Sequence, residues 1–231
     1  MVLMLLSPNV LAVDTTLNEF GYQTRSFDWV LRKSKRDIKI YSAKVSDSKY
    51  KAILSVMTVK APIETLVALL TDLDNCSKWA AMCKEAKTLS RVSRTESIVY
   101  SLNDAPFPVR DRDVVAKVNW SINSETQKVS MVSRAIVSPL NLKKGVVRVR
   151  QAVSEWHFTP QENGETLVEN FAHINPNGTL PAWVMNLLVI ESPFRTFKKM
   201  RSTVESGKYD NAVVPFLSNK TNIKAKIKTI E

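Results

Sequence analysis

The residues best placed to do chemistry are four consecutive charges, Arg110, Asp111, Arg112 and Asp113. They lie at the start of an otherwise largely apolar strand, which is predicted over 112–122. Side chains alternate between faces along a strand, so the two arginines share one face and the two aspartates the other. The residues that continue the arginine face are all apolar: Val114, Ala116, Val118 and Trp120. We therefore expect Arg112 to point inward and Asp113 to hold a neighbouring element on the opposite face.

An inward guanidinium needs a partner, because an unpaired buried charge is strongly destabilising. One role for Arg112 is a salt bridge that fixes a hairpin. The other is a polar anchor at one end of a ligand cavity. The sequence leaves both roles open.

The remaining titratable groups do not form a catalytic set. His157 and His173 have no nucleophile at a recognisable spacing, so we expect structural roles for both. The acidic pairs on predicted turns and strands are expected to be solvated or bridging, since carboxylates are mostly exposed. The five glycines are isolated, which excludes a phosphate-binding loop and a dinucleotide fingerprint. We expect no catalytic residue, no metal and no cofactor.

Cys76 and Cys83 are seven positions apart, near the end of a predicted helix. In an exported protein they could be oxidised to a disulfide, but the sequence does not show whether their geometry permits it.

The first residues, MVLMLLSPNVLA, form a short apolar run that ends on a small residue before Val13. This pattern is typical of a secretory signal, although the usual basic start is missing. A plain hydrophobic segment is the alternative. We expect a signal peptide over 1–12 and a periplasmic or secreted protein.

The net charge of +11 is concentrated in three segments, with net charges of +4 over 25–39, +4 over 195–208 and +3 over 220–231. Such patches suit an anionic membrane surface, or are simply solvated basic faces. An oligonucleotide binder would interleave these cations with exposed aromatic rings, whereas the aromatic residues here follow apolar faces. We expect no nucleic-acid partner.

Hydrophobic periodicity predicts the order helix, two strands, helix, antiparallel meander, long helix. The first helix is predicted over 14–36, with a break near Gly21. Pro193 is expected to kink the last helix, whose apolar stripe is Trp183, Leu187, Ile190, Phe194, Phe197 and Val204. Within 147–158 the apolar residues change phase, which predicts a bulge near Gln151 or Ser154. From 209 onward the sequence indicates a basic tail.

Three stretches in this order resemble a START (steroidogenic acute regulatory protein-related lipid transfer) domain of the bacterial type, in the helix-grip superfamily. LLTDLDNCSKWAAMCKEAKTL resembles the family's helix and the segment that follows it, including Trp79. APFPVRDRDVV resembles its proline turn and Arg-Asp strand start, and HINPNGTLPAWVMNLL resembles the strand, turn and Pro-x-Trp that begin its last helix. The resemblance covers about residues 20–205.

The resemblance implies an α+β fold in which a curved antiparallel sheet wraps around a long C-terminal helix and encloses a hydrophobic cavity. We assign residues 13–208 to this domain. On the predicted strand 96–103, a hairpin through Pro106 and Pro108 would place Leu102 opposite Arg112 and Glu96 near Val118. The residues we expect to bind the ligand are Trp79, Glu96, Ile98, Tyr100, Leu102, Arg112, Val114, Ala116, Val118, Trp120, His173, Trp183, Leu187 and Phe194. A close-packed core would show the same apolar pattern.

We therefore expect a monomeric, non-catalytic protein that binds and transfers a lipid or another hydrophobic small molecule, with peripheral contact to anionic membranes. The alternative is an enzyme of the same superfamily, similar to the polyketide aromatase/cyclases. Such an enzyme would place acid–base groups in the cavity, and Arg112, Glu96, His157 and His173 are the candidates.

Overall fold

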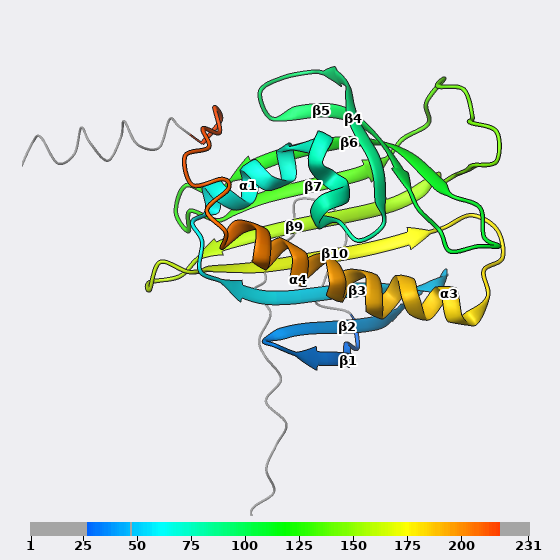
Figure 1. Ribbon diagram of the computed structural model, residues 1–231, viewed down its shortest axis with the longest axis horizontal. Helices are drawn as coiled ribbons and strands as arrows, with labels where there is room; N and C mark the ends of the chain where they lie inside the picture. Colours follow the sequence, from blue (N-terminus) through cyan, green and yellow to red (C-terminus); the bar gives the residue numbers. More distant parts are fainter. Residues whose placement is uncertain (1–26, 47, 218–231) are drawn as a thin grey trace, which may run out of the picture.

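The computed structural model describes residues 27–46 and 48–217. These residues form one sheet with strand order β1-β2-β3-β10-β9-β7-β6-β5-β4, and β8 pairs with β6 (Figure 1). Every pairing except β6 with β8 is antiparallel. The strands are β1 (Val30–Lys35), β2 (Ile38–Val45), β3 (Ser48–Val59), β4 (Cys83–Arg91), β5 (Glu96–Asn103), β6 (Arg112–Ile122), β7 (Val129–Ala135), β8 (Val147–Arg148), β9 (Gln151–Pro160) and β10 (Thr166–Asn175).

The helices lie on one face of this sheet, which we call the inner face (Figure 1). Their bounds are α1 (Ile63–Thr71), a 3-10 turn (Leu73–Asn75), α2 (Cys76–Trp79), α3 (Ala182–Asn186), a π-helical turn η3 (Leu187–Glu191) and α4 (Ser192–Val204). The last three are contiguous, and we call them together the C-terminal helix. The predicted α+β class, with an antiparallel sheet and a long C-terminal helix, is confirmed. No helix formed by the described residues combines the length and the hydropathy that crossing a bilayer requires.

Aromatic packing joins the inner face to the C-terminal helix. Trp156 of β9 stacks on Phe197 of α4 with ring centroids 5.6 Å apart, and on Phe158 at 6.3 Å. Trp79 of α2 meets Trp156 edge-on at 6.4 Å. Aromatic side chains bury large areas, so these rings carry much of the hydrophobic stabilisation of this core.

The predicted helix over 14–36 is wrong for residues 30–35, which form β1. Arg36 and Asp37, with φ of 54° and 56°, make a two-residue turn that pairs β1 with β2. Such a turn matches the twist of a hairpin, and it overrides the apparent helical spacing of the apolar residues before it. Residues 1–26, including the predicted signal peptide, lie outside the described residues.

The C-terminal helix departs from a regular α-helix before Pro193. Proline has no N–H to donate to the preceding turn, and the π-helical turn η3 stands directly before α4. A π-turn accommodates an additional residue, so the side chains of α3 are rotated relative to those of α4. Val184 and Leu188 therefore face the sheet, whereas Trp183 is half exposed.

The segment after α4 packs against the core, so our predicted tail is wrong for residues 209–217. Tyr209, Val214 and Leu217 are buried. The Tyr209 hydroxyl donates a hydrogen bond of 2.7 Å to Asp72, which ties this segment to the end of α1. Residues 218–231 lie outside the described residues.

A buried ion pair attaches β8 to the sheet. β7 ends opposite Ala116, and β8 takes the place beside Arg112 and Asp113 that β7 leaves open. Arg148 of β8 donates from Nε and Nη2 to the two carboxylate oxygens of Asp113, at 2.7 and 2.9 Å. These side chains are 8% and 0% exposed. The predicted structural role of Asp113 is confirmed, and the bidentate geometry satisfies both charges.

We expect Asp113→Asn to lower the free energy of unfolding by about 3–5 kcal/mol, because it leaves the Arg148 guanidinium buried without a counter-charge. Urea denaturation measures the difference. The matched control is Glu96→Gln, which breaks the more exposed pair of Glu96 with Lys117 at 2.9 Å and should change stability by less than about 1 kcal/mol. Equal urea midpoints for the two variants would show that the buried pair does not hold β8 in place.

Candidate functional site

A pocket of about 370 Å³ lies between the C-terminal helix and the inner face of the sheet. Its walls are predominantly apolar, the composition typical of ligand pockets. The sheet contributes Ile53, Val114, Ala152, Trp156, Ala172 and Ile174, and the C-terminal helix contributes Val184, Leu188 and Phe197.

Small side chains on β9 and β10 provide the space. Ala152 lies opposite Ile174, Ser154 opposite Ala172, and Trp156 opposite Asn170. Because alternate residues share a face, all these side chains project toward the C-terminal helix. Small residues occupy three of the positions, whereas Trp156 and Phe197 close the deep end.

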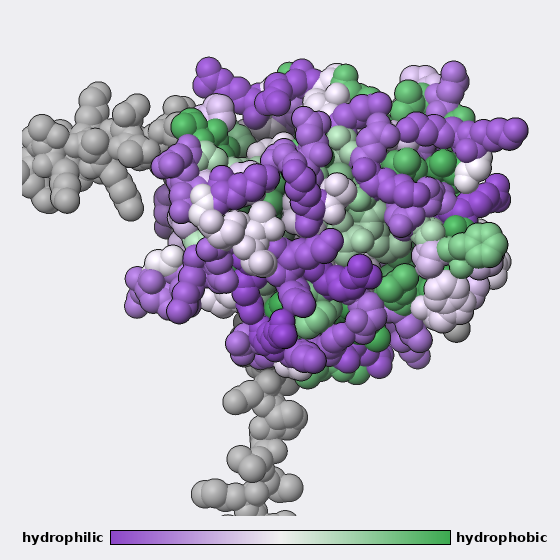
Figure 2. Space-filling view, viewed as in Figure 1, coloured by the Kyte–Doolittle hydropathy of each residue, from purple (hydrophilic) through white to green (hydrophobic). Residues whose placement is uncertain are grey.

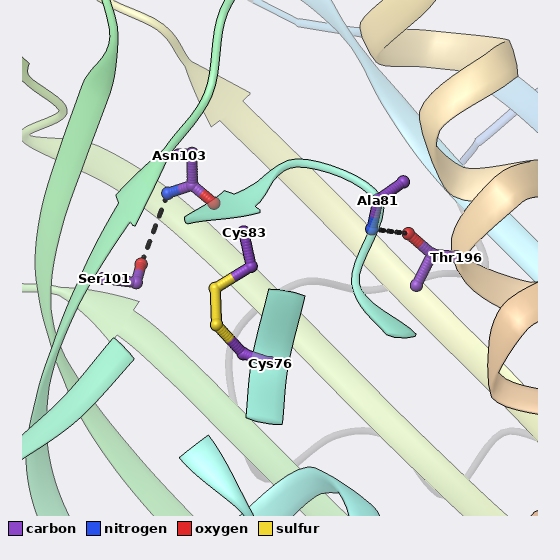
Figure 3. Close-up of a disulfide and its surroundings, with 6 residues drawn as sticks. All are labelled: Cys76, Ala81, Cys83, Ser101, Asn103 and Thr196. Atoms are coloured by element: carbon purple, nitrogen blue, oxygen red, sulfur yellow. Dashed lines mark hydrogen bonds between the residues drawn. A yellow bond between two sulfur atoms is a disulfide. The ribbon is translucent and has the colours of Figure 1, made fainter. Parts of the chain in front are cut away.

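The loop between α2 and β4 forms a further wall, and Figure 3 shows how it is held. A disulfide joins Cys76 to Cys83, which answers the question that the sequence left open. Within the loop, the Ala81 N–H donates a hydrogen bond of 3.0 Å to the Thr196 hydroxyl of α4. The disulfide and this bond fix the loop between the sheet and the C-terminal helix, where Ala80, Ala81 and Met82 line the pocket.

Arg112 marks one end of the pocket. Its Nε donates to the Pro176 carbonyl at 3.4 Å, and its Nη1 donates to the Arg110 carbonyl. No carboxylate among the described residues forms an ion pair with Arg112, since Asp113 is held by Arg148 and Asp111 by Lys84. Burial and the neighbouring Arg110 lower the pKa of Arg112. Of its two possible roles, the salt bridge is therefore not the one that Arg112 fulfils.

The predicted register between β5 and β6 is wrong by one residue. Arg112 lies opposite Asn103, and Asp113 lies opposite Leu102. A one-residue shift moves every side chain of the strand to the other face. The predicted site residues of β5 are therefore on the outer face, away from the pocket: Glu96, Ile98, Tyr100 and Leu102.

Other predicted site residues also lie outside the pocket wall. His173 is on the outer face, where its Nε2 is 3.1 Å from the Ser48 hydroxyl, and burial lowers its pKa. It borders a second, polar pocket of about 830 Å³. Trp183 and Leu187 do not reach the main pocket because the π-turn rotates their positions. Phe194 is in the core, with Lys33 4.3 Å above its ring.

On the inner face, two of the predicted site residues reach the pocket. Arg112 and Val114 line the pocket. Ala116 and Val118 are buried further along β6, and Trp120 packs on Phe216 with ring centroids 5.5 Å apart. Trp79 is not part of the pocket wall, and its ring packs edge-on against Trp156, which is.

Sequence reasoning missed the pocket residues of β9, β10 and the α2–β4 loop. The predicted phase change near Gln151 is present, between the end of β8 and the start of β9. Val149 lines the pocket, and so do Ala152 and Ser154, although an odd and two even positions would point to opposite faces of one regular strand. The alternation from Ala152 onward was the available signal. The loop Ala80–Met82 has no periodic pattern that would have revealed it.

Comparison with known proteins agrees with this geometry. The family model for the START domain matches residues 21–208. The chain belongs to the START domain family. An uncharacterised protein of Pseudomonas aeruginosa is 34% identical over 180 residues, which cover 77% of this chain and 87% of that protein.

Two further relatives carry names that state their activity. The crystal structure of the STAR-related lipid transfer protein from Xanthomonas axonopodis matches this START domain with a TM-score of 0.70 and 29% identity, over 77% of this chain and 98% of that one. Human phosphatidylcholine transfer protein is 27% identical over 166 residues, which cover 69% of this chain and 75% of that protein.

The groups that an enzyme would use do not meet in the START pocket. Glu96 forms an ion pair with Lys117 on the outer face. His157 is also on the outer face, with Nδ1 2.8 Å from the Ser130 hydroxyl. With His173 likewise outside, the structure does not favour the cyclase alternative.

Proposed function

We propose that this protein is a non-catalytic carrier that binds one lipid in the pocket beneath the C-terminal helix and transfers it between membranes. The observation that carries the proposal is an apolar pocket in a domain whose relatives are named for lipid transfer. Burying an acyl chain there contributes about 0.8 kcal/mol per methylene, so affinity requires no covalent step.

The polar contacts that hold the C-terminal helix are concentrated at α4, which would allow the α3 end to move and admit a ligand. Glu191 pairs with Lys33 of β1 at 2.8 Å, and Arg201 donates to the carbonyls of Arg36 and Thr58. Together with the Thr196 bond, these contacts fix α4. The α3 end begins at a loop and exposes Trp183, so we infer that ligand passes at this end.

Arg112 is the anchor we propose for the lipid headgroup. It is a guanidinium at the edge of an apolar pocket with no carboxylate paired to it among the described residues. Guanidinium groups bind carboxylates and phosphates in a bidentate manner. The ligand class that fits is an amphiphile with an anionic headgroup.

Arg112→Met tests this assignment. We expect native mass spectrometry of the purified wild-type protein to show a co-purified lipid. The variant should unfold at nearly the same urea concentration, yet bind a long-chain fatty acid about 10- to 150-fold more weakly, as expected for a lost charge-assisted hydrogen bond.

Arg110→Met is the matched control, because it removes an exposed charge two residues away and should leave affinity nearly unchanged. A large loss of stability in Arg112→Met would assign that residue to the fold instead. Failure of the wild-type protein to bind fatty acid, phospholipid or sterol probes would refute the carrier proposal itself.

The pocket end of the molecule also carries the features of a membrane-docking surface. Phe107, in the β5–β6 loop, is 93% exposed, Arg110 is exposed three residues later in the same loop, and Trp183 is exposed at the start of α3. Figure 2 shows apolar surface between the polar side chains in the half of the view where α3 and these loops lie. We propose that the loops insert into anionic membranes, while the basic residues of β1 and α4 add long-range attraction.

Phe107→Asp should weaken binding to vesicles containing anionic phospholipid, because it replaces an exposed apolar side chain with a charge that the membrane repels. Sedimentation of vesicles at low and physiological salt measures the loss. Val213→Asp is the control, since Val213 is 79% exposed and belongs to the segment after α4, which lies at the other end of the sheet from α3 (Figure 1). Equal loss in both variants, or none in either, would contradict docking through the pocket end.

We further propose that the protein is exported. The supporting observations are the apolar run over 1–12 and the disulfide, since disulfides persist in oxidising compartments.

Cell fractionation should therefore find mature protein in the periplasm, beginning near Val13, with Cys76 and Cys83 oxidised in its intact mass. Protein that retains Met1 and is recovered from the cytosol with free thiols would contradict export.

A further inference from the structure

Two polar side chains interrupt the apolar wall deep in the pocket. Asn170 of β10 and Ser154 of β9 both line it, on the inner face beside Trp156 and Ala172. Asn170 is only 9% exposed. An apolar wall does not require either polar side chain. The hydrogen bonds that these two side chains already make therefore determine which ligand group they could bind.

The amide of Asn170 is held in one orientation. Its Nδ2 donates to the Ser154 hydroxyl at 3.0 Å and to the backbone carbonyls of Glu155 and Phe171 at 3.1 and 3.3 Å. These bonds occupy the nitrogen. Among the described residues no group donates to Asn170 Oδ1, which leaves an acceptor at the pocket.

Ser154 supplies the complementary group. Its oxygen accepts from Asn170, so its own proton is left for another acceptor. One donor and one acceptor therefore stand side by side in an apolar wall. A hydroxyl is the simplest group that both donates and accepts, and it would satisfy both residues.

A third polar side chain lies next to this pair. Ser55 of β3 is directly opposite Asn170, so the two share the inner face. It is fully buried, and its hydroxyl has no hydrogen-bond partner among the described residues. Buried polar groups are rarely left unpaired, because desolvation without a partner is unfavourable. This layer of the sheet thus has more hydrogen-bonding capacity than the protein itself uses.

We infer that Asn170 and Ser154 form a second polar subsite, which binds a hydroxyl group on the hydrophobic part of the ligand. This inference rests on the proposed lipid-binding function. The ligand class becomes an oxygenated amphiphile, with its anionic headgroup at Arg112 and a hydroxyl at Asn170.

The strands give the separation of the two subsites. Arg112 contacts the carbonyl of Pro176, six residues beyond Asn170. A strand advances about 3.4 Å per residue, and β10 ends at Asn175, one residue before Pro176, so the subsites are about 17–20 Å apart. An extended chain covers about 3.5 Å for every three bonds, so roughly 15–17 bonds connect them. The subsite therefore selects a hydroxyl near the far end of a long chain.

The test uses octadecanoic acid and octadecanoic acids with a single hydroxyl at carbon 10, 12, 14, 16 or 18, with affinities measured by displacement of a fluorescent fatty acid. The wild-type protein should bind a far-end hydroxy acid about tenfold more tightly than the plain acid, as expected for one or two satisfied hydrogen bonds. In Asn170→Leu and in Ser154→Ala the ratio of the affinity for the hydroxy acid to that for the plain acid should fall toward one, while the affinity for the plain acid is kept or rises.

Asn119→Leu on the outer face is the matched control and should preserve the ratio. Ser154→Ala removes only the hydroxyl, so it remains informative if Asn170→Leu does not fold. A wild-type ratio of one for every hydroxyl position, with tight binding of the plain acid, would overturn the subsite and leave the carrier proposal intact. A ratio retained in both variants would also overturn it. If no acid binds, the carrier proposal fails for this ligand class, and the subsite fails with it.

Discussion

The Asp113–Arg148 ion pair is the interaction on which the rest of the site depends. It binds β8 beside the start of β6, and the chain then passes from β8 to β9 with a change of phase. Val149, Ala152 and Ser154 consequently all reach the pocket, although they do not share one strand phase. The pair also occupies one of the two carboxylates adjacent in sequence to Arg112, and Lys84 pairs with the other, Asp111, so no carboxylate among the described residues forms an ion pair with that guanidinium.

The pocket exists because two segments depart from regular geometry. The π-turn before Pro193 rotates α3, so Val184 and Leu188 face the sheet while α4 keeps Phe197 on Trp156. The disulfide-closed loop then fills the side that the helix leaves open, and Thr196 connects the two. A regular helix on a regular sheet would bring side chains into close packing, as protein interiors normally do.

Alternation of apolar and polar residues in the sequence was sufficient to predict the bounds of β5 and β6, Glu96–Asn103 and Arg112–Ile122, residue for residue. Pairing register was not predictable, since it depends on how many residues the β5–β6 loop places outside the ladder, and one residue reversed the face of β5. The rotation of α3 was missed for a related reason: a 3.6-residue period assumes an uninterrupted helix. Arg112 and Val114 were placed correctly because their inference used the phase within a single strand and needed no partner.

The position of Arg112 has a consequence for the proposed carrier. A headgroup charge bound deep in the pocket would have to cross an apolar interior on every transfer, and an isolated charge in such surroundings is strongly destabilised. If the exposed Phe107 and Trp183 insert into the membrane as proposed, a charge held by Arg112 at the pocket end would remain close to the membrane interface while the chain withdraws. A neutral hydroxyl can enter more deeply, because its desolvation is far less unfavourable and Asn170 offsets much of it. The arrangement thus separates a charged group that is easily released from a neutral group that confers selectivity.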